Sequence, residues 1–299
     1  FNIKRFDNND GSSFVRPPTL RGLSPDQTLV LINGKRRHRS ALVVLDGSAA
    51  TVGAQAVDLS KIPMGAVKRI EVLRDGAAAQ YGSDAIAGVI QFVLKDADHG
   101  GSVSLQTGQF FEGDGEDFKI EGNIGLALTE NGFLNLTASY SDSAKTSRGI
   151  DYPAAVYYDE VLGLENVPRP AMNWGNPDIT SLATFFNAGI ALDNGIDLYA
   201  FGNYGAATSE LSFYFRRPLA IGEDGNGVGL ADGYSYSQTS VYKDSIYEQT
   251  DVYPADWDLT DIYPGGFTPE FSGDLTDVSI VLGAKGEFES GVTWDVSSR

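Results

Sequence analysis

Alternation of apolar and polar residues dominates the C-terminal two-thirds of the chain. Between Phe118 and Leu128 the large apolar side chains fall on one face of an extended chain, and the same period of two recurs in later segments. This period predicts β-strands with one apolar and one polar face. Seven strands are expected, at residues 102–111, 118–128, 133–140, 183–192, 196–216, 277–288 and 292–297. The fifth strand is ambiguous, because Tyr199 and Phe201 put bulk on its nominally polar face.

The connections between these strands alternate in length. Short turns ending in Gly132, Gly195 and Gly291 follow the second, fourth and sixth strands. Long loops, at about residues 149–180 and 217–274, follow the third and fifth. Outer-membrane barrels sort their connections in this way, with the long loops outside the cell. A soluble β-sandwich has no reason to sort its loops by parity, so the pattern favours a barrel over a sandwich.

The first 98 residues predict a small mixed α+β domain. Short apolar and β-branched runs, bounded by Asn-Gly and Asp-Gly turn signals, indicate strands rather than long helices. The expected strands are Thr28–Asn33, Ala41–Leu45, Arg69–Leu73 and Ala87–Leu94. A short capped helix is expected over Ile62–Val67.

Composition narrows the class of protein. The chain has no cysteine, which excludes disulfides, cysteine-ligated metals and a cysteine nucleophile. No run of about 20 apolar residues occurs, so a transmembrane helix is excluded, whereas a barrel strand needs only about 9–11 residues. Residues 1–100 hold 13 Lys plus Arg against 10 Asp plus Glu, and residues 101–299 hold 9 against 30. A basic first part and an acidic second part attract each other, although acidic loops also simply keep a surface soluble.

The first part contains an ordered set of short motifs: Arg21-Gly-Leu23, Val30-Leu-Ile-Asn-Gly34, Asp58-Leu59, Ile62-Pro63, Arg69-Ile-Glu-Val-Leu-Arg74, Tyr81-Gly82 and Ala87-Gly-Val-Ile90. Together they resemble the plug domain of TonB-dependent outer-membrane receptors. The resemblance implies an α+β plug domain at residues 1–98, followed at 99–299 by the first antiparallel transmembrane strands of a barrel. Barrels of about 22 strands enclose such plugs.

The resemblance also implies a function. Receptors of this family import a scarce extracellular solute, such as an iron chelate, across the cell outer membrane of Gram-negative bacteria. The inner-membrane TonB complex drives them through the periplasm, so the implied partners are that complex, the small extracellular solute and outer-membrane lipids. Seven strands cannot close, and open sheet edges are costly in lipid. We therefore expect the polypeptide to continue past Arg299 with roughly fifteen more strands.

Two other functions stay open. A non-transporting barrel that binds ligands at the surface or has a structural role would keep its plug shut. A secreted soluble β enzyme would need protein to cover the aliphatic faces of the strands. No catalytic constellation supports an enzyme, and His38 and His99 lack the spacing of metal ligands, so we expect no catalytic residue, metal or cofactor.

The run Lys35–Arg39 is the sharpest cluster of charge, and three interpretations compete for it. It pairs with an acidic barrel wall, it contacts an anionic substrate through Arg36 and Arg37, or it binds nucleic acid. The charge asymmetry favours the first interpretation. Nucleic acid is the poorest fit, because no aromatic residues interleave with the cations and most of the chain is acidic.

Two further sets of residues are candidates for a role. Arg69, Glu71 and Arg74 resemble the charged plug positions that engage the barrel interior in the family, although a solvated strand face is also common for such residues. In the loop at 217–274, Tyr253 and Trp257 are candidates for stacking on a flat or sugar-like ligand. Long loops also pack their own aromatic residues together. No pattern in the loops selects a particular solute.

Overall fold

The computed structural model describes residues 2–3, 12–44, 52–74, 76–148, 151–218 and 262–299. These residues divide into two compact units. The first consists of Phe1–Lys145, Pro177–Ser209 and Ser272–Arg299, and the second of Thr146–Asn176 and Glu210–Phe271. No helix among the described residues is long and apolar enough to cross a membrane.

A four-stranded sheet, here called the small sheet, lies at the centre of the N-terminal part. Its strand order is β4-β3-β6-β5, and β3 runs parallel to β6 but antiparallel to β4. The strands are β3 (Thr28–Ile32), β4 (Lys35–Arg36), β5 (Val67–Leu73) and β6 (Gly88–Leu94). All five residues of β3 are buried. Its alternate side chains enter two apolar clusters, one on each face of the sheet.

Short elements surround the small sheet. The helix α1 and the neighbouring 3₁₀ turn η5 cover one face, where Tyr81 and Ala85 pack against Leu29 and Leu31. The strands β1 and β2 form a separate two-stranded sheet. These elements are β1 (Asn2–Ile3), β2 (Pro18–Thr19), α1 (Ala77–Tyr81), η1 (Ser12–Phe14), η2 (Pro25–Gln27), η3 (Leu59–Lys61), η4 (Met64–Ala66) and η5 (Ser83–Ala85).

Two predictions for this part are wrong. Described residues 41–44 form no strand, because Asn33 and Gly34, both with positive φ, turn the chain back at once. The antiparallel partner of β3 is therefore β4, and β6 occupies the other side. Residue Val44 instead donates its N–H to the Ala54 carbonyl. The helix predicted over Ile62–Val67 is replaced by the 3₁₀ turns η3 and η4, which Pro63 separates.

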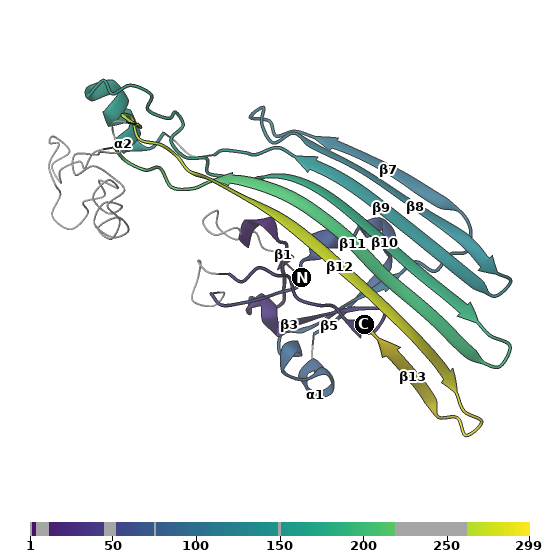
Figure 1. The fold of residues 1–299 in the computed structure, drawn as a ribbon. Helices are drawn as coiled ribbons and strands as arrows, with labels where there is room; N and C mark the ends of the chain where they lie inside the picture. The colour runs from purple at the N-terminus through teal and green to yellow at the C-terminus, as the bar shows by residue number, and fades with distance from the viewer. Residues whose placement is uncertain (1, 4–11, 45–51, 75, 149–150, 219–261) are drawn as a thin grey trace, which may run out of the picture. The chain divides into compact units, whose positions relative to one another are not determined.

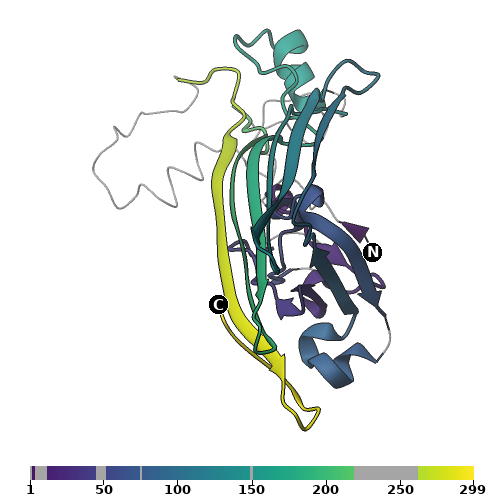
Figure 2. The same ribbon diagram turned by 90° about the vertical axis from the view of Figure 1, so that its right-hand side faces the viewer.

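Seven strands form a second sheet, here called the large sheet, in the order β13-β12-β11-β10-β9-β8-β7. Each strand therefore lies beside its neighbours in the chain, and the predicted antiparallel strands are confirmed. In Figures 1 and 2 the sheet curves, and the N-terminal part lies on its concave side. The strands are β7 (Gly101–Gly108), β8 (Asp117–Thr129), β9 (Gly132–Ser143), β10 (Asp178–Ala191), β11 (Ile196–Ser212), β12 (Glu270–Glu287) and β13 (Thr293–Ser298).

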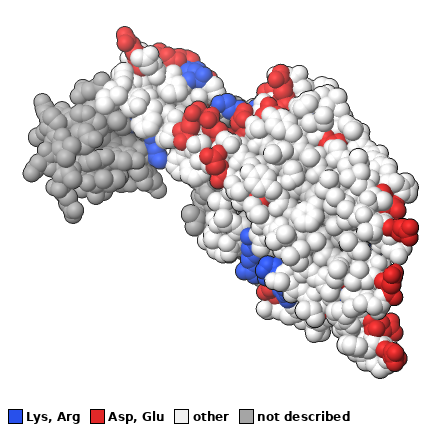
Figure 3. Space-filling view, turned by 45° about the vertical axis from the view of Figure 1, so that its right-hand side comes forward, with Lys and Arg blue, Asp and Glu red and all other residues white. Residues whose placement is uncertain are grey.

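The two faces of the large sheet are inverted relative to those of a water-soluble protein. Outward side chains such as Leu136 and Ile280 are apolar and exposed, by 38% and 53%. Inward side chains such as Asn135 and Thr137 are polar and only 3–4% exposed. Figure 3 shows a broad surface over the strands on which few charged residues appear, with acidic residues along its border. An exposed apolar face above a covered polar face is the arrangement of a barrel wall in lipid.

The second unit has an apolar core of its own. The helix α2 (Pro153–Val156) continues into a π-helical turn, Tyr157–Val161, whose Tyr158 is completely buried. Burial raises the pKa of Tyr158 to about 12. Tyr152 and Phe215 pack around it. In this unit, loop aromatics pack against one another. Tyr253 and Trp257 lie outside the described residues, so their proposed contact with a ligand stays a prediction.

Candidate functional site

An apolar patch joins the small sheet to the inner face of the large sheet. The cluster that contains Ile90 and Phe92 of β6 also contains Phe185, Phe201 and Val281, which come from β10, β11 and β12. These three bulky side chains stand on a face that also carries polar residues such as Asn187 and Asn203. The ambiguity of the fifth predicted strand has this origin, because Phe201 points inward to an apolar partner and not outward to lipid.

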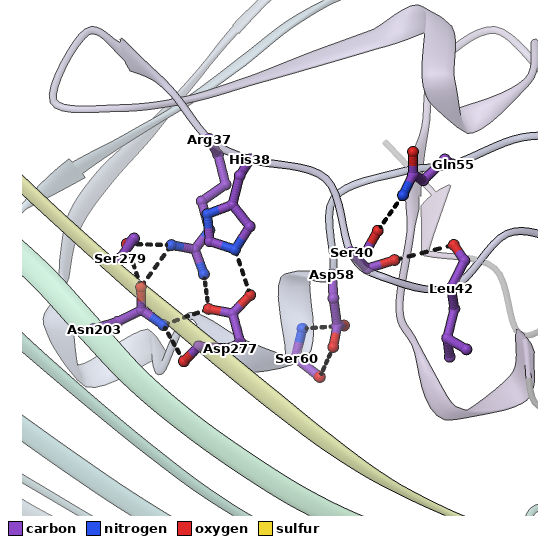
Figure 4. Close-up of polar contacts among 10 residues, drawn as sticks. All are labelled: Arg37, His38, Ser40, Leu42, Gln55, Asp58, Ser60, Asn203, Asp277 and Ser279. Carbon is purple, nitrogen blue, oxygen red and sulfur yellow. Dashed lines mark hydrogen bonds and ion pairs between the residues drawn. The ribbon is translucent and has the colours of Figure 1, made fainter. Parts of the chain in front are cut away.

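Beside this patch lies a polar group, here called the Arg37 cluster, which Figure 4 shows in close-up. Arg37 donates from Nη1 to Asn203 Oδ1 at 2.6 Å and to Ser279 Oγ at 2.7 Å. Its Nη2 makes an ion pair with Asp277. His38 Nε2 lies 2.7 Å from the other oxygen of Asp277. Two consecutive residues of the N-terminal part therefore bind the large sheet, Arg37 at β11 and β12 and His38 at β12.

The ion pair in the Arg37 cluster is well removed from water. The side chain of Arg37 is 3% exposed and that of Asp277 is 13% exposed. Burial lowers the pKa of Arg37, and the attraction of Asp277 acts in the opposite direction. An arginine keeps its proton in proteins, so the pair stays charged. Such a pair contributes little net stability, but the loss of one partner leaves the other charge buried alone.

Lys61 is a second buried cation near this cluster. It is 2% exposed, and burial lowers its pKa against the attraction of Asp58 and Asp277. The stem of Lys61 lies over Gly205 of β11, where an added Cβ would come 3.0 Å from Cδ. Asp58 is itself fixed, since it accepts hydrogen bonds from the N–H groups of Arg16 and Ser60 at 2.9 Å each. The glycine at position 205 of the large sheet thus leaves room for the side chain of Lys61.

A third contact fixes the segment that leaves the small sheet. Asn33 Nδ2 donates to Asn187 Oδ1 at 3.2 Å, and Asn33 Oδ1 accepts the N–H of Leu94 at 2.9 Å. Asn187 in turn donates to the Lys95 carbonyl at 3.0 Å. Asn135 donates to another carbonyl of this segment, that of Ala97, at 3.4 Å. Two inward-facing asparagines of the large sheet, Asn135 and Asn187, therefore hold residues 95–97.

The residues of the predicted cluster Lys35–Arg39 make ion pairs with three different carboxylates, those of Asp295, Asp84 and Asp277. Lys35 pairs with Asp295 of β13 at 2.9 Å, and although burial opposes it, hydrogen bonds to Asp295 and Tyr199 raise the pKa of Lys35. Arg36 is exposed and pairs with Asp84 of the N-terminal part at 2.6 Å. The contacts of Lys35, Arg37 and His38 are those expected if the run pairs with an acidic wall. A role of Arg36 and Arg37 in binding substrate stays a prediction.

The three charged residues on β5 and after it are exposed. Arg69 pairs with Glu71 on the same strand at 2.7 Å, and Gln91 of β6 donates to the other oxygen of Glu71 at 2.9 Å. Arg74 is exposed directly after β5. Within the described part of the chain, the hydrogen bonds of Arg69 and Glu71 stay inside the small sheet. The hypothesis that these residues engage the barrel interior therefore stays a prediction.

Sequence reasoning missed several residues of this contact region. The alternation places Asp277 and Asn203 on the polar face but does not say which polar side chain meets the N-terminal part. Lys61 carries no signal, because it follows a capped turn like any surface lysine. Asn33 was assigned only to a turn. Each contact joins residues far apart in the chain, and local periodicity contains no information about such pairs.

Comparison with known proteins places the N-terminal part in a family. Residues 2–89 match the family model described as TonB-dependent Receptor Plug Domain. These residues are a TonB-dependent receptor plug domain. The predicted resemblance is thereby confirmed, and the polar and apolar contacts above are contacts between a plug domain and the inner face of barrel strands.

Relatives of the chain are similar over both parts. It is 35% identical over 130 residues to the vitamin B12 transporter BtuB of Vibrio cholerae serotype O1, a match that covers 43% of this chain and 18% of that protein. It is 27% identical over 246 residues to the ferrienterobactin receptor of Escherichia coli K12, which covers 74% of this chain and 32% of the relative. The chain therefore spans less than a third of the length of these relatives.

A solved structure is similar to the fold as a whole. The ferric enterobactin receptor PfeA of Pseudomonas aeruginosa, a mutant in complex with enterobactin, superposes with a TM-score of 0.56 at 16% identity. The superposition covers 99% of this chain and 36% of that one. The plug domain followed by barrel strands is thus the fold of this chain. The boundary predicted between residues 98 and 99 stays a prediction.

Proposed function

We propose that the whole protein is an outer-membrane receptor of a Gram-negative bacterium that imports a small extracellular solute. The observation that supports this most directly is the contact region between the plug domain and the inner face of the large sheet, here called the seam. It consists of the apolar patch around Phe201, the Arg37 cluster and the contacts of Lys61 and Asn33. A polar, partly charged seam lies inside a wall whose outer face is apolar, as an internal plug in a lipid-embedded wall requires.

The seam is suited to being opened and closed. Its polar part consists of single side-chain contacts, such as Arg37 with Asp277 and Asn33 with Asn187. In the part of the chain that the structure describes, no β-ladder joins the small sheet to the large sheet. Side-chain contacts of this kind exchange with water when the plug moves, whereas a shared β-ladder would have to be broken as a unit. The force for that movement comes, in this proposal, from the TonB complex on the periplasmic side.

An iron chelate is the solute class we propose first. The support is that several similar proteins are named as receptors of ferric siderophores, among them the ferrienterobactin receptor and PfeA. A vitamin B12 transporter is also among the relatives, so a cobalamin is the next solute to test.

Uptake by cells tests the proposal. Cells that carry the full-length receptor should accumulate radiolabelled iron from a matching ferric chelate, and deletion of the TonB complex should abolish this accumulation while surface binding persists. Binding without TonB-dependent accumulation of any chelate or cobalamin would instead identify a non-transporting surface barrel. A control for TonB-independent passage is the same receptor without its plug domain, which should leak solutes whether or not the TonB complex is present.

A further inference from the structure

A cavity of about 310 Å³ lies at the edge of the small sheet. It is lined by Asp26 of η2, by Thr28 at the start of β3, by the run Arg36–Arg39, and by Arg299 after β13. Small-molecule sites begin at about this size, near 300 Å³. The cavity therefore has room for a small ion or acid but not for a bulky chelate.

Three buried polar atoms of residues that line this cavity have no hydrogen-bond partner among the described residues. They are Asp26 Oδ1, Thr28 Oγ1 and Arg37 Nε. Thr28 and Arg37 are only 5% and 7% exposed. Native proteins leave few buried polar atoms unpaired, and each exception calls for an explanation. Three such atoms around one cavity leave hydrogen bonds that a ligand in the cavity could supply.

The charges around the cavity favour a negative ligand. Arg36 and Arg39 share one carboxylate, that of Asp84, at 2.6 and 3.6 Å. The two guanidinium groups therefore carry one more positive charge than the acid they share. Arg299 donates to the Arg36 carbonyl at 2.8 Å, which brings a fourth guanidinium to the cavity beside those of Arg36, Arg37 and Arg39. Guanidinium groups bind the oxygens of carboxylates and phosphates particularly well.

The carboxylate of Asp26 adds a second requirement. A carboxylate only accepts hydrogen bonds, so it repels an anion without a proton and attracts one that offers an O–H group. We propose that the cavity binds a small oxyanion that still carries such a proton. The phosphate monoanion and small hydroxy acids share this chemistry. The ligand would accept from Arg37 Nε and donate to Asp26, and would thereby join the plug domain to Arg299.

Calorimetric titration of the purified full-length receptor in detergent micelles tests this inference without any transport measurement. Sodium phosphate, in a mildly acidic buffer where the monoanion predominates, should bind saturably. Sulfate has no proton to donate there and should bind at least ~10-fold more weakly, since a site built to accept a hydrogen bond rejects an analogue that lacks the donor. A second titration with glycolate distinguishes phosphate from a hydroxy acid as the ligand. If glycolate displaces phosphate at a concentration below that of phosphate, a hydroxy acid is the better ligand.

Variants assign the roles. Asp26→Asn should abolish the preference for phosphate over sulfate, because the amide donates as well as accepts. Thr28→Val and the exposed Arg39→Gln should each weaken phosphate binding by roughly 10-fold, as expected for one lost hydrogen bond to a charged ligand. Lys68→Gln on β5, away from the cavity, is the matched control and should change nothing. Absence of saturable phosphate binding, or equal binding of phosphate and sulfate by the unchanged receptor, would overturn the inference and leave a cavity that holds water.

Discussion

The small and large sheets bury their side chains in opposite ways, although both consist of ordinary β-strands. In β3 of the small sheet every residue is buried, because protein covers both faces. In β9 and β12 of the large sheet, polar inward residues are covered and apolar outward residues are exposed. Strand geometry is the same in both sheets, so the difference lies in what touches each face. It shows that the outer face of the large sheet is built for a solvent other than water.

The seam between the two sheets also has two kinds of contact. Phe185, Phe201 and Val281 extend the apolar core of the plug domain into the wall, whereas Asn187, Asn203 and Asp277 meet it with hydrogen bonds. Apolar contacts hold the domain in place with little directional preference. The polar contacts fix its register against particular strands.

The largest effect is expected from breaking the buried ion pair. Arg37→Met leaves Asp277 without its cation in the seam and should lower the free energy of unfolding by about 3–5 kcal/mol. Chemical denaturation of the refolded full-length receptor measures this. The double variant Arg37→Met with Asp277→Leu should recover most of the loss, because it removes both charges. A double variant as unstable as the single one would mean that the pair itself stabilises the seam.

A charge on the outer face should cost somewhat less. Ile280→Arg places a cation on the apolar face and should destabilise the receptor in lipid vesicles by about 2–4 kcal/mol if the site lies near the middle of the bilayer. The matched control is Gln106→Arg, on the inner face of β7 in the same sheet. That change should stay within about 0.5 kcal/mol. Similar values for the two variants would remove the distinction between the faces.

The amide contact at the exit of the plug domain should have a smaller effect. Asn187→Ala removes the donor to the Lys95 carbonyl and the acceptor for Asn33, at an expected cost of about 1–3 kcal/mol. Hydrogen exchange should show faster exchange at the N–H groups of residues 94–97 and no change in β3. Unchanged exchange throughout residues 94–97 would show that other contacts hold this segment.

The smallest effect is expected at Lys61. Burial lowers its pKa, so the unfolded chain binds this proton more tightly, and the contribution of Lys61 to stability rises as the pH rises toward its ordinary value of 10.5. Lys61→Met should be neutral or stabilising by about 1 kcal/mol near neutral pH and should remove that part of the pH dependence. Exposed Lys68→Met is the control, expected within about 0.5 kcal/mol of the unchanged receptor.

Much of the fold could be predicted from the local pattern of apolar and polar residues. Few of the contacts in the seam could be predicted in this way. Alternation located all seven strands of the large sheet, because a period of two is a property of each strand alone. The run Ala41–Leu45 looked like a strand by the same criteria, but both edges of β3 were already occupied by β4 and β6. Competition for a sheet edge is decided by the rest of the fold. Likewise, the pairing of Arg37 with Asp277 depends on how the plug domain packs against the inner face of the large sheet.

The most direct measurement concerns the solvent on each side of β12. No cysteine occurs in these 299 residues, so Ile280→Cys and Val281→Cys each introduce the single labelling site of this part of the protein, on opposite faces of one strand. Each carries a spin label in the full-length receptor reconstituted into vesicles. The label at residue 280 should collide readily with oxygen and hardly with a water-soluble nickel chelate, and the label at 281 should be shielded from both. A label at residue 280 that the nickel chelate reaches freely would contradict a lipid-facing outer surface.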